Sequence, residues 1–442
     1  MTSIWSHSCL AMKTARPAGA GAGSFLGAAV FLIFTGSALG QPVQKYSRLT
    51  VVAKRAELKI GTRVVGLLHR GDTFAVQEIR DGWYWVSEIG RRGWVRQRDA
   101  MPIDRAIRFF TEAIRQNPTA ADYAIRGRLR NMKGGQIAGA IADFSEAIRL
   151  DPSQAELYKE RGINYYIRRE FDKAIADYAE AIRLAPDNPD YLALRANTFR
   201  EKGDDEQAIA DYSSAIRLSP SRWQSFEARA RLWLNKDEYD RAIADFDEAI
   251  RLNPSPELAS LDWVGRAGAR LAKGDSEQAV KEFNEAVRLS ADDPWIRDYV
   301  RGSRAIAWLG LERYDDAISD LEKGIESSPR QSGFYAVLAW TRAACPDARY
   351  RDGAKAVENA TKAVELKRYP NADREAILAA AYAEAGDFDR AVESQKKAIE
   401  LAPPNEKSHF REALELFEQG MPYREQHPDG WHPGFSFDTF IQ

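Results

Sequence analysis

The chain has 442 residues, of which 63 are Lys or Arg and 65 are Asp or Glu, and 44% are hydrophobic. This length allows two or three domains, and the apolar fraction is that of a folded soluble protein. The formal charge of -2, with both signs mixed along the chain, argues against nucleic acid as a partner. Phosphate binding requires a concentrated basic surface, and the sequence has none.

The N-terminus has the pattern of an export signal. Two basic residues precede the apolar segment FLGAAVFLIF, and the small residues Ala38 and Gly40 follow it. We expect residues 1–40 to be a signal peptide cleaved after Gly40, which places the protein in the periplasm or cell envelope. An uncleaved membrane anchor is the alternative, since about 20 apolar residues can span a bilayer. Whether the chain starts at Met12 stays open.

Residues 45–102 contain short runs in which apolar residues alternate with polar ones. Such runs, separated by Gly and Asp turns, predict strands. The runs are SRLTVV, RVVGLLH, TFAVQEI, WYWVSEI and RRGWVRQ. We expect the segment between the first two runs, AKRAELKIGT, to be a variable loop.

Three motifs in this region resemble a bacterial SH3-like domain: Gly71-Asp72, Gly82-Trp83-Tyr84 and Gly93-Trp94-Val95. The resemblance implies a small all-β barrel that binds cell-wall material or peptides. The candidate ligand surface consists of Trp83, Tyr84, Trp85 and Trp94. The alternative is that these aromatic rings fill the core and groove of the barrel itself.

From residue 103 onward, one phrase recurs with a proline at its end. Five such prolines are spaced by 34 residues: Pro118, Pro152, Pro186, Pro220 and Pro254. A fixed period of this length is typical of stacked helix pairs, so the fold class is mainly α, an α-solenoid. The run YKERGINYYIRREFDKAIADYAEAIRLAP resembles the tetratricopeptide repeat family.

The predicted array has a half repeat at 103–118, eight helix pairs, a capping helix at 404–420 and a flexible aromatic tail at 421–442. The eight pairs are expected at 119–152, 153–186, 187–220, 221–254, 255–291, 292–329, 330–368 and 369–403. The tail carries five aromatic residues, and we expect it to fold back on the array.

An Arg in the first helix of most repeats precedes an acidic residue in the second helix by 16 positions. Where Leu378 replaces the Arg, Ser394 replaces the acid, so the two positions change together. This predicts an ion pair inside each repeat, and not a column of ligands. The predicted pairs are Arg161–Asp177, Arg195–Asp211, Arg229–Asp245, Arg266–Glu282 and Arg304–Asp320.

By resemblance, the first helices line a groove that binds a segment of a partner protein. The candidate partner-binding residues are Lys159, Tyr166, Asn197, Arg200, Glu227, Arg231, Val264, Leu271 and Ile306. The first six are polar and the last three form an apolar half that is expected to be open. The alternative is an ordinary solvated or packed helix face.

No pattern of catalytic residues is present in the sequence. The five His residues are scattered, no cofactor or small-molecule motif occurs, and Cys345 sits in a connection between two predicted helices. We therefore expect a non-enzymatic interaction scaffold of the cell envelope, without metal, cofactor or small-molecule substrate. The alternative is a wall-binding or peptide-binding module that acts through the SH3-like domain, with the array as a spacer. The sequence does not predict the oligomeric state.

Overall fold

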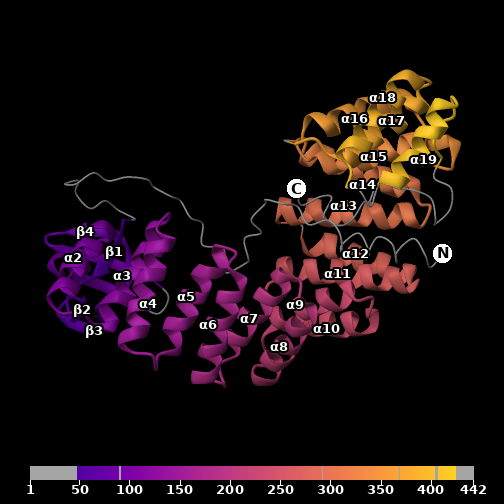
Figure 1. Ribbon diagram of the computed structural model, residues 1–442. Coiled ribbons are helices and arrows are strands. Elements are labelled where there is room, and N and C mark those ends of the chain that lie inside the picture. The colour runs from indigo at the N-terminus through magenta and orange to yellow at the C-terminus, as the bar shows by residue number, and fades with distance from the viewer. Residues whose placement is uncertain (1–46, 89–90, 291, 368, 404–406, 425–442) are drawn as a thin grey trace. The chain divides into compact units, whose positions relative to one another are not determined.

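The computed structural model describes residues 47–88, 91–290, 292–367, 369–403 and 407–424 (Figure 1). These residues form two compact units, 47–218 and 219–424. The expected signal peptide and residues 425–442 of the expected tail lie outside the described residues. Within the described residues, no helix has the length and apolar character needed to cross a bilayer.

The unit at 47–218 begins with an antiparallel sheet of seven strands in the order β3-β2-β6-β5-β4-β1-β7. In β4 and β5 the predicted alternation buries alternate side chains, namely Phe74 and Val76 on β4 and Tyr84 and Val86 on β5. The strands are β1 (Arg48–Val51), β2 (Arg55–Ile60), β3 (Arg63–His69), β4 (Thr73–Arg80), β5 (Trp83–Glu88), β6 (Arg91–Arg96) and β7 (Ala100–Pro102).

The structure corrects the prediction for this region in two respects. The sheet is open, because among the described residues its outer strands β3 and β7 do not pair with each other, whereas a closed barrel was expected. The expected loop AKRAELKIGT contains β2, which pairs with β3 and with β6. Its alternating Ala56 and Leu58 are each 1% exposed, and this period of two was visible in the sequence.

The sheet packs directly on the first helices. Val52 forms a buried cluster with Phe110 of α2 (Ile103–Gln116) and with Ile125 of α3 (Ala120–Lys133). Arg70, at the turn between β3 and β4, pairs with Asp122 of α3 at 2.9 Å and lies over the ring of Phe110. The sheet therefore covers the start of the helical array and is part of the same compact unit.

The prediction of a solenoid of helix pairs is confirmed. Each expected repeat contains two helices, and α2 occupies the expected half repeat. The remaining helices of this unit are α4 (Ile137–Leu150), α5 (Ala155–Ile167), α6 (Phe171–Leu184), α7 (Pro189–Lys202) and α8 (Asp205–Leu218).

The unit at 219–424 continues the pattern and ends with the expected capping helix, α19. Its helices are α9 (Trp223–Asn235), α10 (Tyr239–Leu252), α11 (Pro256–Lys273), α12 (Ser276–Leu289), α13 (Pro294–Gly310), α14 (Tyr314–Ser327), α15 (Ser332–Ala344), α16 (Gly353–Glu365), α17 (Ala372–Glu384), α18 (Phe388–Leu401) and α19 (Lys407–Glu418).

Small residues let the two helices of a repeat approach each other. A Cβ atom at Gly162 of α5 would lie 2.8 Å from the ring of Tyr178 on α6, so only Gly fits there. At the turn between α7 and α8, Gly203 takes the left-handed conformation with φ 90° and is followed by Asp204. Sequence features of single residues thus set both the spacing and the turn of the helix pair.

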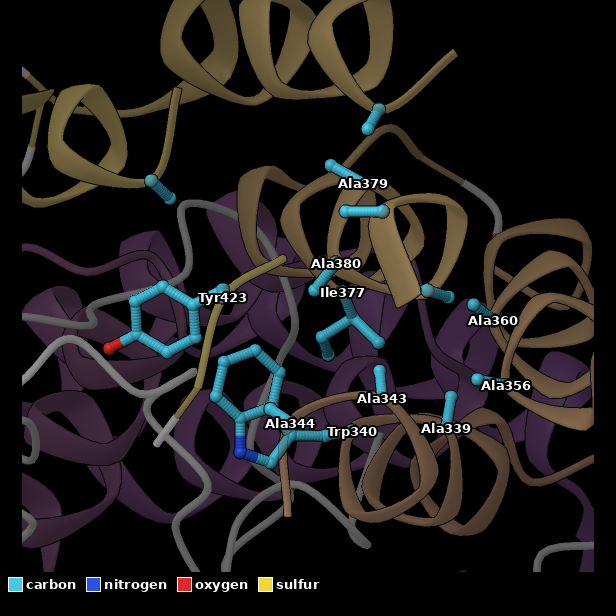
Figure 2. Close-up of a cluster of buried hydrophobic side chains, with 14 of the residues drawn as sticks. Ala339, Trp340, Ala343, Ala344, Ala356, Ala360, Ile377, Ala379, Ala380 and Tyr423 are labelled. Carbon is cyan, nitrogen blue, oxygen red and sulfur yellow. The ribbon is translucent and has the colours of Figure 1, made fainter. Parts of the chain in front are cut away.

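The chain after α19 packs back onto the last repeats. Tyr423 is 7% exposed, and its ring centroid lies 5.5 Å from that of Trp340 on α15. Figure 2 shows the two rings side by side. Arg424 pairs with Glu384 at the end of α17 at 2.6 Å. The first residues of the tail at 421–442, which was predicted to be flexible, are therefore anchored on the array. This contact agrees with the expectation that the tail folds back on the array.

Candidate functional site

In the unit at 47–218, the candidate groove residues lie on the first helices α5 and α7 and are partly buried. Lys159 pairs with Glu156 at 2.5 Å, and Asn197 accepts a hydrogen bond from the Tyr212 hydroxyl at 2.6 Å. Burial raises the pKa of Tyr166. Arg200 contacts its neighbour Glu201 at 3.3 Å. Lys159, Asn197 and Arg200 thus each contact a residue of their own repeat, and Tyr166 is partly buried.

In the unit at 219–424, successive first helices α9, α11, α13, α15 and α17 contact one another and form what we call the first-helix face. Glu227 and Arg231, one turn apart on α9, form an ion pair at 3.0 Å. Their side chains are 28% and 43% exposed, so this part of the face is open to a partner.

Beside this pair lies Asp262 of α11, which the sequence analysis did not single out. Its residue is 1% exposed, and neither carboxylate oxygen has a hydrogen-bond partner among the described residues. Burial and the Glu227 carboxylate raise the pKa of Asp262 to about 7, although Arg231 and Asn253 act in the opposite direction. A buried carboxylate without a partner is costly, and such groups cluster at functional sites.

A signal for Asp262 was present in the sequence. Counted from the Arg of each repeat, Asp262 stands four positions before Arg266, where Leu157 and Tyr191 stand before Arg161 and Arg195. Both of those residues are buried. Charged residues also stand at this register at Asp122 and Arg374, each 7% exposed, so a comparison between repeats could have found Asp262 as one of three such positions.

The apolar half of the predicted groove is wrong at two of its three positions. Val264 and Leu271 are each 1% exposed and belong to the hydrophobic core of the unit, while Ile306 is partly buried against it. The reason is the close contact of α11 with α13, which covers these side chains. In this structure the first-helix face exposes its charged residues Glu227 and Arg231 in part, and not these apolar ones.

The residues predicted to pair inside each repeat lie within ion-pair distance. The shortest distances are 2.7 Å for Arg161–Asp177, Arg195–Asp211 and Arg229–Asp245, 3.2 Å for Arg266–Glu282 and 2.6 Å for Arg304–Asp320. Glu282 also pairs with Arg270 at 2.8 Å, a contact that the spacing of 16 did not reveal. In all five pairs the carboxylate is nearly buried, which suits a structural role.

The predicted SH3-like ligand surface is divided by the pleat of the sheet. Tyr84 points into the core and is 6% exposed, so its assignment to the surface is wrong. Trp83, Trp85 and Trp94 are partly exposed, and the rings of the last two lie 5.3 Å apart. Arg96 lies over Trp83 and Arg80 over Trp94. The three indoles remain candidates for binding.

Cys345 ends helix α15 and is 2% exposed, so its thiol is buried. Within the described segments, no group of three or more His, Cys, Asp and Glu side chains is placed to hold a metal ion. The cluster of Glu227, Arg231 and Asp262, with its buried carboxylate, is the candidate site that these residues leave.

Comparison with known families agrees with these elements. One tetratricopeptide repeat model matches residues 129–189, 193–257 and 228–294, and a second tetratricopeptide repeat model matches residues 376–405. A variant SH3 domain model matches residues 68–97. No curated protein matches the chain.

Several solved structures are similar over part of the chain. A tetratricopeptide repeat protein from Parabacteroides merdae ATCC 43184 has 19% identity and a TM-score of 0.44, covering 70% of this chain and 98% of its own. YrrB, described as a TPR protein with an unusual peptide-binding site, has 19% identity and a TM-score of 0.37, covering 42% and 93%. The MamA protein has 20% identity and a TM-score of 0.37, covering 39% and 92%. The matches to family models, together with the fold, identify this chain as a tetratricopeptide repeat protein with an SH3-like domain ahead of the repeats.

Proposed function

We propose that the chain is a non-enzymatic interaction scaffold of the cell envelope that binds a segment of a partner protein on its first-helix face. The observation that carries the proposal is the cluster of Glu227, Arg231 and Asp262. A solenoid gains no stability from burying an unpartnered carboxylate, so the presence of Asp262 beside two partly exposed charges favours a binding role.

Site-specific photocrosslinking tests this proposal. Benzoylphenylalanine replaces Arg231 on the first helix α9 or, as a matched control, Arg251 on the second helix α10. The Arg251 side chain is 63% exposed and pairs only locally with Glu248. We expect one discrete crosslinked partner from position 231 and none from position 251. Equal labelling from both positions, or no labelled protein from position 231, would count against the proposal.

The location in the envelope rests on the N-terminal sequence pattern. If residues 1–40 are removed on export, the mature chain starts at Gln41, and its formal charge is -2 - 2 = -4, because Lys13 and Arg16 are lost. Intact-mass measurement of the protein from the envelope fraction tests this. A membrane-bound chain that keeps its leader would support the anchor alternative.

A second candidate function is binding through the SH3-like domain, favoured by the partly exposed indoles of Trp83, Trp85 and Trp94. The array would then be a spacer. The contact of Arg70 with Asp122, however, ties the sheet to the first repeat at 2.9 Å, so the domain is not a separate module on a linker. Both functions must therefore be tested in the full chain.

A further inference from the structure

The charges around Asp262 are not balanced within the chain. Two carboxylates, those of Glu227 and Asp262, lie near one guanidinium, that of Arg231. Arg231 is engaged by Glu227 at 3.0 Å and makes no ion pair with Asp262. The residue is 1% exposed, and no donor among the described residues meets its oxygens at hydrogen-bonding distance and angle, although the nearby Asn253 amide favours the ionised form. When both carboxylates are ionised, this group of three side chains therefore has a net charge of one negative unit, which one more cation would neutralise.

Helix α13 adds an aromatic border to this part of the first-helix face. Burial lowers the pKa of Arg231, whereas the Glu227 carboxylate and then Tyr299 raise it, so Tyr299 lies near this site. The Tyr299 ring is stacked on Trp295 with centroids 6.3 Å apart and planes 9° apart. Trp295 is 50% exposed. An open indole face attracts cations, most strongly when water is excluded.

We propose that Glu227 and Asp262 receive a lysine or arginine side chain of the partner segment, with Trp295 alongside. This inference rests on the proposed function and names the chemistry of the partner at that site. The incoming ammonium or guanidinium donates hydrogen bonds to the carboxylate oxygens of Asp262, and Arg231, which is long and 43% exposed, moves aside. A neutral side chain would not offset the free-energy cost of burying the ionised Asp262 carboxylate.

Proton competition gives this site a pH dependence with a definite sign. The groups that act on Asp262 are Glu227 and Arg231 of α9 and the Asn253 amide after α10, while Tyr299 of α13 acts on Arg231. With a pKa of about 7, the Asp262 carboxyl is largely protonated at pH 6 and ionised at pH 8. A cationic ligand must displace that proton, so its affinity rises from pH 6 to pH 8.

The test uses the full chain and two defined probes, N-acetyl-arginine methylamide and its neutral isostere N-acetyl-citrulline methylamide. Binding at pH 8 is measured by NMR titration. We expect saturable binding of the arginine probe, at least about tenfold tighter than the citrulline probe, the difference that charge-assisted hydrogen bonds supply. Asp262→Asn removes this preference. Asp240→Asn, in which the exposed partner of Lys273 changes, keeps it.

Equal binding of the two probes, no saturable binding of the arginine probe, or an unchanged preference in Asp262→Asn would each overturn the inference. Thermal unfolding of both variants establishes that they are folded, and Glu227→Gln provides a second variant with an expected smaller loss. Failure of this inference is distinguishable from failure of the proposed function. If a partner crosslinks at position 231 but its affinity does not change when its Lys and Arg residues are replaced, the proposed function is retained and only this inference is refuted.

Discussion

Asp262 shows how one side chain can make stability depend on pH. Its pKa in the folded chain is about 7, raised from the ordinary value of 3.8 for an aspartate. Between these two values Asp262 binds more protons in the folded than in the unfolded state, so its contribution to stability is most favourable below about pH 4 and falls as the pH rises toward 7. The slope contributed by one group reaches at most about 1.4 kcal/mol per pH unit.

Asp262→Asn should therefore raise the free energy of unfolding at pH 8 by an amount on the order of 2 to 4 kcal/mol, with a much smaller gain at pH 4. Denaturant unfolding of the variant and the parent chain at both pH values measures this. The same gain at both pH values would mean that the ionisation of Asp262 is not the cause.

The ion pair between Arg195 and Asp211 provides a second prediction at this scale. The Asp211 side chain is 10% exposed, so Arg195→Leu leaves a carboxylate with little access to water. We expect a loss of about 2 to 4 kcal/mol in the free energy of unfolding. Arg183→Leu, which breaks the exposed Arg183–Glu180 pair, should cost less than about 1 kcal/mol. Similar losses in the two variants would refute the structural assignment.

These residues mark what a single sequence can and cannot predict. The repeats supplied an internal comparison, so the joint loss of Arg and acid at Leu378 and Ser394 was enough to predict ion pairs. Asp262 was missed because its register, which holds a charge also at Asp122 and Arg374, does not show how each buried charge is satisfied, and that is a property of packing. Val264 and Leu271 were misassigned for the same reason.

At the scale of elements, the turn between β3 and β4 is held against α3. Gly71 has φ +94°, and a Cβ there would lie 2.7 Å from Cγ1 of Ile125. Gly71→Ala should lower the free energy of unfolding by about 2 to 3 kcal/mol, through backbone strain and this contact. Gly82→Ala is the matched control, because Gly82 has φ +84° but open space around its Cβ position. Equal losses would show that the contact with Ile125 contributes nothing.

The segment after α19 is a second element whose role can be measured. Tyr423→Ala removes a ring that is buried against Trp340, and we expect a loss of about 3 kcal/mol in the free energy of unfolding. Tyr369→Ala, at a position 69% exposed, should change it by less than about 0.5 kcal/mol. If Tyr423→Ala unfolded at the same denaturant concentration as the parent chain, the anchoring contact would have no energetic weight.

Helix pairs were predictable at this scale because a period of 34 residues repeats itself, whereas the strands were harder. β2 was missed because its alternation was short and crowded with charges, and β7 has only three residues. The open sheet was not predictable from runs of alternation, which indicate strands but not whether the first and last strands meet.

At the scale of the whole molecule, the described chain forms two compact units, and the SH3-like sheet belongs to the first of them together with α2 to α8. The sequence suggested a separate module followed by an array. The buried cluster of Val52, Phe110 and Ile125 shows that the segment after β1 packs on the first helices, beside a separate core inside the sheet. The sheet therefore acts as a cap for the array, which a solenoid needs at its ends.

The central claim is that a partner binds on the first-helix face. Hydrogen–deuterium exchange of the full chain, alone and with the partner recovered by crosslinking, tests it most directly. The account predicts slower exchange in α9 and α11, with β5 and β6 unchanged. Slower exchange in β5 and β6 with α9 and α11 unchanged would contradict it and would assign binding to the SH3-like domain.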